Sequence, residues 1–101
     1  MYSRVARYKI PEDKLDDAVR SFEDALRELG GLSGLQRAYL LIDRDNSTAL
    51  TVTFWESRAA LEASEVTASR LRSEAMGGLD GEIVAVDRCE VALESGNPTT
   101  A

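Results

Sequence analysis

Apolar residues recur with two different periods along this chain. Four segments show the alternation, or the dense β-branched and aromatic composition, of strands: residues 2–10, 35–43, 50–55 and 82–93. Between the first two, apolar residues from Leu15 to Leu29 return every three or four positions, which is the period of a helix with one buried stripe. Pro11 suits the start of this helix, and Gly30-Gly31 suits its end.

The third predicted strand runs directly into a second helix. Its side chains alternate between two faces, with Leu50, Val52 and Phe54 on one and Thr51, Thr53 and Trp55 on the other. Ser57 is a good N-cap for the helix that follows, because its hydroxyl can accept a hydrogen bond from a free backbone N–H. The apolar spacing of this helix is interrupted near residues 64–67 and resumes up to Met76, so we expect a break or bend there.

The order of elements is strand, helix, strand, strand, helix, strand. This order predicts an α+β fold of the ferredoxin-like βαββαβ type, with a four-stranded antiparallel sheet and both helices on one face. The strands carry bulky side chains on both faces, so the other face needs a cover. We therefore expect a homodimer, with two sheets packed face to face in a dimeric α+β barrel. One domain is predicted over residues 1–93, followed by a flexible C-terminal tail at 94–101.

Composition narrows the classes of partner. The 101 residues include 12 Lys and Arg against 18 Asp and Glu, a net charge of −6, which argues against a nucleic-acid partner and an anionic membrane surface. No apolar run approaches the ~18 residues of a membrane span. Cys89 is the only cysteine, which excludes an internal disulfide. With no signal-peptide pattern at the N-terminus, the sequence predicts a cytoplasmic protein.

The stretch T-V-T-F-W-E-S (51–57), followed by R-A-A-L-E (58–62), resembles the signature of antibiotic biosynthesis monooxygenase (ABM) domains. The resemblance extends over residues 2–93. It implies a ferredoxin-like chain that pairs into a dimeric α+β barrel. It also implies a monooxygenase that acts on a small aromatic phenol or quinol and needs no metal or other cofactor.

The resemblance implies a set of site residues. Trp55 would form a cavity wall, Thr51 with Tyr8 or Tyr39 would orient the substrate, and Phe22 would contact it. Arg7 or Arg37 would stabilise an oxyanion. Other roles are open for several of these residues. Trp55 can pack in the core, and Arg7 and Arg37 can lie at the barrel rim and pair with acidic residues, while Arg70 and Arg72 are expected on the solvated face of the second helix.

Two absences favour a second hypothesis. The chain has no histidine, so it lacks the usual general base and the axial ligand that haem-degrading relatives need. Thr51 stands where the oxygenases would present an amide, and a hydroxyl makes fewer hydrogen bonds than an amide. The alternative is a non-catalytic dimeric protein of the same fold that binds a small molecule or has a structural role.

Overall fold

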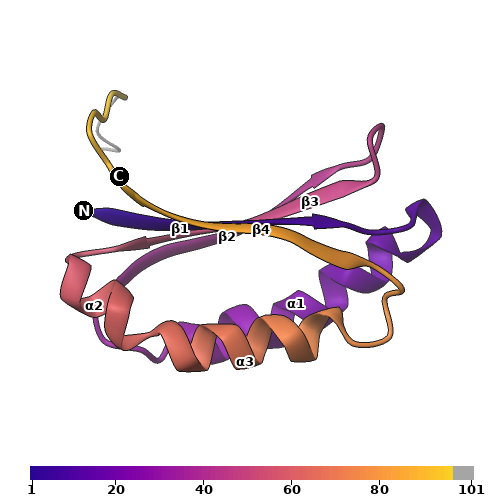
Figure 1. The fold of residues 1–101 in the computed structure, drawn as a ribbon, viewed down its shortest axis with the longest axis horizontal. Helices are drawn as coiled ribbons and strands as arrows, with labels where there is room; N and C mark the ends of the chain where they lie inside the picture. The colour runs from indigo at the N-terminus through magenta and orange to yellow at the C-terminus, as the bar shows by residue number, and fades with distance from the viewer. Residues whose placement is uncertain (97–101) are drawn as a thin grey trace, which may run out of the picture.

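The computed structural model describes residues 1–96, and residues 97–101 lie outside this description. The elements follow in the order β1 (Tyr2–Lys9), η1 (Glu12–Lys14, a 3-10 turn), α1 (Leu15–Leu29), β2 (Leu35–Asp43), β3 (Thr48–Trp55), α2 (Arg58–Ala63), α3 (Glu65–Met76) and β4 (Glu82–Glu90). The sheet order is β2-β3-β1-β4, and all neighbouring strands are antiparallel. The predicted ferredoxin-like α+β fold is confirmed, with all helices below one face of the sheet (Figure 1).

The predicted helix boundaries follow from local chemistry. In α1 the apolar stripe is buried against the sheet through Leu15, Ala18, Phe22 and Leu29. The Ser57 hydroxyl accepts a hydrogen bond from the Ala60 N–H at 3.1 Å and caps α2, as expected. The expected break falls at Ser64, whose hydroxyl donates back to the Leu61 carbonyl at 2.6 Å and separates α2 from α3.

The C-terminal strand is shorter than predicted. β4 ends at Glu90 instead of residue 93, although the Val91 N–H still donates to the Met1 carbonyl at 3.0 Å. Strand β1 ends at Lys9, one residue before the predicted end at Ile10, although the Ile10 N–H still donates to the Ser47 carbonyl at 3.1 Å. Of the predicted tail, residues 94–96 are exposed and form no regular element, and 97–101 lie outside the described residues.

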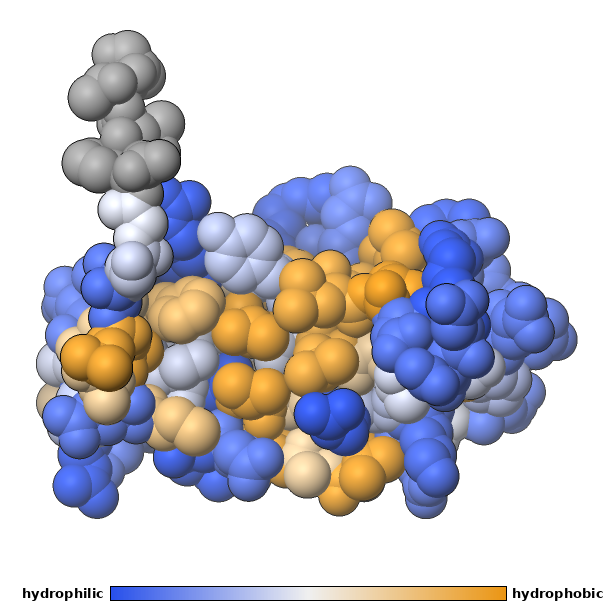
Figure 2. Space-filling view, turned by 90° about the horizontal axis from the view of Figure 1, so that it is seen from above, coloured by the Kyte–Doolittle hydropathy of each residue, from blue (hydrophilic) through white to orange (hydrophobic). Residues whose placement is uncertain are grey.

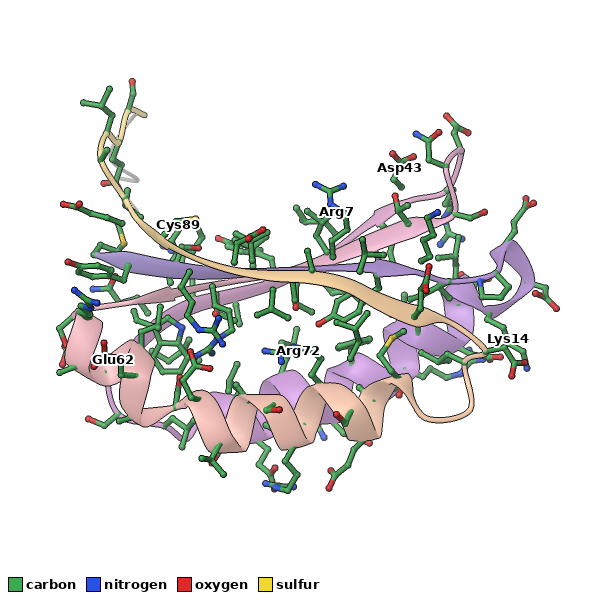
Figure 3. The ribbon with its side chains drawn as sticks, in the orientation of Figure 1. Arg7, Lys14, Asp43, Glu62, Arg72 and Cys89 are labelled. Carbon is green, nitrogen blue, oxygen red and sulfur yellow. The ribbon has the colours of Figure 1, made fainter. Side chains whose placement is uncertain are left out.

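The second face of the sheet carries no helix and is largely apolar (Figure 2). This open face is formed by alternate residues of the four strands, of which the large apolar ones are Val5, Tyr39, Leu41, Leu50, Val52 and Phe54. On β4 the smaller Ala85 lies opposite Arg7 on the same face. Arg7 and Cys89 project from the same side (Figure 3), and Cys89 is exposed. No helix within residues 1–96 combines the length and apolar character needed to cross a bilayer.

Candidate cavity between the sheet and the helices

A small cavity lies between the sheet and the helices. It encloses about 40 Å³ and measures about 380 Å³ when its open mouth is included. Its apolar side consists of helical residues, namely Phe22, Ala25, Leu26 and Leu29 of α1 with Ala68 and Leu71 of α3. Its polar side consists of Arg4, Tyr8, Thr51, Thr53 and Arg72. At about 40 Å³ the cavity itself is much smaller than the roughly 300–1,000 Å³ of typical ligand pockets.

Two hydroxyl groups from adjacent strands meet at the cavity. The Tyr8 hydroxyl and the Thr51 Oγ1 are 2.8 Å apart and share a hydrogen bond. The Tyr8 ring is buried and packs against Phe22, with 5.2 Å between the ring centroids. Burial raises the pKa of Tyr8 above its usual value, although the Thr51 hydrogen bond and the Arg72 charge act in the opposite direction. Tyr8 is therefore a neutral phenol at neutral pH, and its O–H can donate.

Arg4 is buried at the sheet side of the same cavity, with 3% of its surface exposed. A single nitrogen, Nη2, donates to the Leu61 carbonyl at 3.0 Å, the Ser64 hydroxyl at 2.9 Å and Glu65 Oε1 at 2.9 Å. Its Nε and Nη1 are buried and have no hydrogen-bond partner among the described residues. The guanidinium carbon lies 5.7 Å from the centre of the Trp55 ring, a cation–π contact that partly offsets desolvation.

Glu65 joins Arg4 of β1 to Arg88 of β4. The Arg88 Nη2 donates to Glu65 Oε2 at 2.7 Å, and Arg4 binds the other carboxylate oxygen. The hydrogen bond from Arg88 has the largest effect and, together with the hydrogen bond from Arg4 and the charges of both arginines, lowers the pKa of Glu65 to about 2, while burial acts in the opposite direction. The carboxylate therefore remains charged at neutral pH, and it fixes the first turn of α3 to two strands.

We expect the Glu65→Gln variant to be less stable at pH 7 by about 1 kcal/mol, because the partly exposed carboxylate loses both ion pairs. A pKa lowered in the folded state stabilises the protein above the unfolded value of about 4.3, and this stabilisation is lost as pH falls towards 2. Urea unfolding at pH 7 and pH 3 should therefore show a smaller difference at pH 3. The exposed Arg58–Glu62 pair supplies the control, Glu62→Gln, and an equal loss in both variants at pH 7 would contradict the special role of Glu65.

Trp55 lies behind the cavity wall. It is fully buried, and its indole Nε1 donates to Thr53 Oγ1 at 2.9 Å. The ring belongs to the part of the core that contains Leu29, Leu61 and Leu71, and it is not a lining residue of the cavity. Thr53 thus stands between the indole and the hollow, and Trp55 orients the hydroxyl of Thr53.

The structure brings together only part of the expected site. Tyr8, Phe22 and Thr51 meet at the cavity, whereas Arg7, Arg37 and Tyr39 lie on the open face of the sheet. Figure 3 shows Arg7 projecting away from the helices. Tyr39 packs edge-on against Phe54 with 6.4 Å between centroids. Within residues 1–96, Arg7 and Arg37 form no ion pair, so the expected rim pairing is absent from the single chain.

The sequence does not reveal the two charged residues of the cavity, Arg4 and Arg72. Arg72 was expected on the solvated face of α3, but it is half-buried, lines the cavity and lies between α3 and the sheet (Figure 3). Arg70 does face outward, where it pairs with Glu28 and Glu74. The signal for Arg72 is its position four residues after buried Ala68. In the sequence, the position of Arg4 could have been found from strand alternation, because Arg4, Ala6 and Tyr8 are two residues apart and lie on the same face of β1.

A helix-covered antiparallel sheet with a cavity of mixed polarity between its layers defines a ferredoxin-like α+β domain. Residues 1–72 match the profile of the family described as "Antibiotic biosynthesis monooxygenase", and the chain belongs to this family. The predicted membership is thereby confirmed. Among curated proteins, Rv2557 of Mycobacterium tuberculosis, described as uncharacterized, is 28% identical over 91 residues, which cover 89% of this chain and 40% of that protein. The chain therefore spans about two fifths of the length of this relative.

Solved structures support the fold. A putative antibiotic biosynthesis monooxygenase from Deinococcus radiodurans has a TM-score of 0.75 at 12% identity, covering 99% of this chain and 100% of that chain. Rv0793 from Mycobacterium tuberculosis has a TM-score of 0.72 at 15% identity, covering 94% and 98%. A protein described as dimeric and ferredoxin-like, from an uncultured marine organism, has a TM-score of 0.70 at 14% identity, covering 95% and 98%. At these identities the likeness concerns the fold alone.

Proposed function

We propose that the cavity binds a small aromatic phenol or quinol and that the chain promotes its oxygenation by O₂. The observation that carries the proposal is the meeting of the Tyr8 and Thr51 hydroxyls and the Arg72 guanidinium against an apolar wall that includes Phe22. An aromatic ring fits the apolar wall, and its oxygen substituent fits the hydroxyls and the guanidinium. Membership of the monooxygenase family agrees with this assignment.

The residues have separate roles in this reaction. Arg72 stabilises the phenolate formed when the substrate loses its proton to water at the mouth, because guanidinium groups remain charged and bind oxyanions. Tyr8 and Thr51 orient the substrate oxygen by hydrogen bonds. For anthrone, the keto tautomer of a phenol, loss of a proton from the ring CH₂ group gives this phenolate, and its reaction with O₂ gives a carbonyl group and one water molecule. One oxygen atom bonds to the carbon, the O–O bond breaks, and the second oxygen leaves with both hydrogens.

The second candidate function is binding without chemistry. It is favoured by the lining of the cavity, which among the described residues contains neither a carboxylate nor an imidazole that could accept the substrate proton. In this case the same side chains hold an aromatic ligand, and the ligand leaves unchanged.

Oxygen uptake with anthrone, corrected for the rate without protein, separates these functions. We expect uptake above background, and we expect Tyr8→Phe and Thr51→Val each to lower it by about tenfold or more, because each removes an orienting hydrogen bond. Tyr2→Phe is the matched control on the same strand, since Tyr2 does not line the cavity. Saturable quenching of Trp55 fluorescence without oxygen uptake would favour binding alone. A loss in Tyr39→Phe but not in Tyr8→Phe would place the site on the open face instead.

The open face supports a second proposal, namely that two copies of the chain pair through it. Its partly exposed apolar side chains extend over all four strands, and soluble monomers rarely expose an apolar patch of more than a few hundred Å². A second identical sheet covers this patch with matching chemistry. Two-fold pairing of like surfaces is also the commonest form of assembly.

A further inference from the structure

The cavity holds more positive charge than its own residues balance. Arg4 and Arg72 both line it, and no Asp or Glu within residues 1–96 does so. Arg4 has one carboxylate partner, Glu65, which it shares with Arg88. Arg72 forms no ion pair with any described residue, unlike Arg70 two positions earlier. In a chain with a net charge of −6, this local excess is a specific feature of the cavity and not of the whole surface.

The hydrogen-bonding state of Arg4 is a second, independent observation. Its side chain is almost fully buried, yet Nε and Nη1 have no hydrogen-bond partner within residues 1–96. A buried guanidinium that leaves two nitrogens unpaired is costly, and such groups are normally completed by protein, water or ligand. The Trp55 ring near the guanidinium carbon is a weak substitute for a hydrogen-bond acceptor. An acceptor that enters the cavity relieves part of this cost.

We infer that the ligand of this cavity is an aromatic carboxylate, whose negative group binds between Arg72 and Arg4 and whose ring packs against the apolar side. The inference rests on the proposed function and adds a second, permanently charged group to the substrate. Guanidinium groups match a planar carboxylate well, while the one free O–H of the Tyr8–Thr51 pair remains available to the phenol oxygen. The small enclosed volume accepts the carboxylate, and the wider mouth accepts the ring.

A carboxylate fits better than a phosphate for two reasons. A phosphate monoester carries nearly two charges at neutral pH, so it loses more hydration on entering a cavity with an apolar side. Phosphate sites also commonly use backbone N–H groups at a glycine-rich loop or a helix N-terminus, whereas the polar lining here consists of side chains on β1, β3 and α3. One negative charge and a flat shape are therefore the properties that the cavity selects.

The test compares benzoate with benzamide, which have nearly the same shape and differ in charge. Calorimetry or NMR titration with the intact protein is expected to give a dissociation constant about tenfold lower for benzoate. In Arg72→Gln this preference should fall to about twofold or less, because the guanidinium that faces the mouth is lost. Arg70→Gln removes the same charge from the outer side of α3 and should keep the preference. Phenyl phosphate is expected to bind more weakly than benzoate.

A second measurement needs no amino-acid substitution and observes the Arg4 side chain directly by NMR. The Nε–H resonance of Arg4 in a ¹H–¹⁵N spectrum should shift on benzoate titration and remain in place with benzamide. Equal affinity for benzoate and benzamide, or an unchanged preference in Arg72→Gln, would overturn the carboxylate assignment and leave the proposed oxygenation of a neutral phenol standing. Tighter binding of phenyl phosphate would also overturn it. Absence of binding by all three probes at millimolar concentration would remove both the carboxylate and the aromatic-ligand assignments.

Discussion

The Trp55→Ala variant is expected to lose about 3–5 kcal/mol of unfolding free energy, the usual cost of removing a fully buried indole. The ring fills the space between β3 and the helices. Leu29, Leu61 and Leu71 lie on α1, α2 and α3, and because these helices are held in place separately, their side chains cannot move together to close the gap. The variant also loses the Nε1–H bond to Thr53 and the cation–π contact with Arg4. Chemical denaturation monitored by circular dichroism measures the change.

Two further variants identify the origin of this loss. Trp55→Phe keeps most of the apolar volume but removes the hydrogen bond to Thr53, so we expect a smaller loss of about 1–2 kcal/mol. Val66→Ala truncates an apolar side chain that is 84% exposed on α3, and it should change stability by less than about 0.5 kcal/mol. A Trp55→Ala variant as stable as the parent would show that the indole is not a core residue.

The same substitutions separate the core role of Trp55 from the expected site role. The family resemblance assigned Trp55 to the cavity wall, whereas the structure places Thr53 between the ring and the hollow. If the cavity is the site, Trp55→Phe should alter stability more than ligand affinity. Thr53→Val should lower both, because the hydroxyl of Thr53 lines the cavity and also accepts the hydrogen bond of the buried indole N–H.

The fold follows from the sequence because its signals are local and mutually consistent. The apolar period of α1, the Ser57 cap and the alternation in β3 each depend on residues close together in the chain. The end of β4 was placed three residues too late, because Val91 and Leu93 have strand composition but the neighbouring strand β1 begins at Tyr2. Composition cannot report where a partner strand stops.

The site was harder to predict because it depends on which face each arginine occupies. Arg7 and Arg4 lie on the same strand, and their phase sends one to the open face and the other into the cavity. Arg7 and not Arg4 was predicted as a site residue, because arginine side chains are rarely buried and the sequence does not show which of the two is. Arg4 is tolerated inside because Leu61, Ser64 and Glu65 accept hydrogen bonds from it, and these partners lie about sixty residues away in the sequence.

The Val52→Asp variant is expected to raise the dissociation constant of the proposed dimer by about 100-fold or more. Val52 lies in the middle of the open face, between Val5 and Tyr39 on the neighbouring strands. In a face-to-face pair, two carboxylates would be removed from water near the two-fold axis without partners, at a cost of several kcal/mol. In the single chain this side chain is half-exposed, so the folded monomer should survive with a modest loss from the poor strand propensity of Asp.

Light scattering after size-exclusion chromatography, at micromolar concentrations, measures the result as molar mass. The parent should elute with twice the mass of the 101-residue chain, and Val52→Asp should elute near the mass of one chain with an unchanged circular dichroism spectrum. Val66→Asp is the matched control, because it introduces the same charge on the exposed side of α3, below the helical layer, and should remain dimeric. If the parent is monomeric, or if both variants stay dimeric, the open face is not the surface through which two copies pair. The partly exposed apolar side chains of this face would then need a cover other than a second copy of the chain.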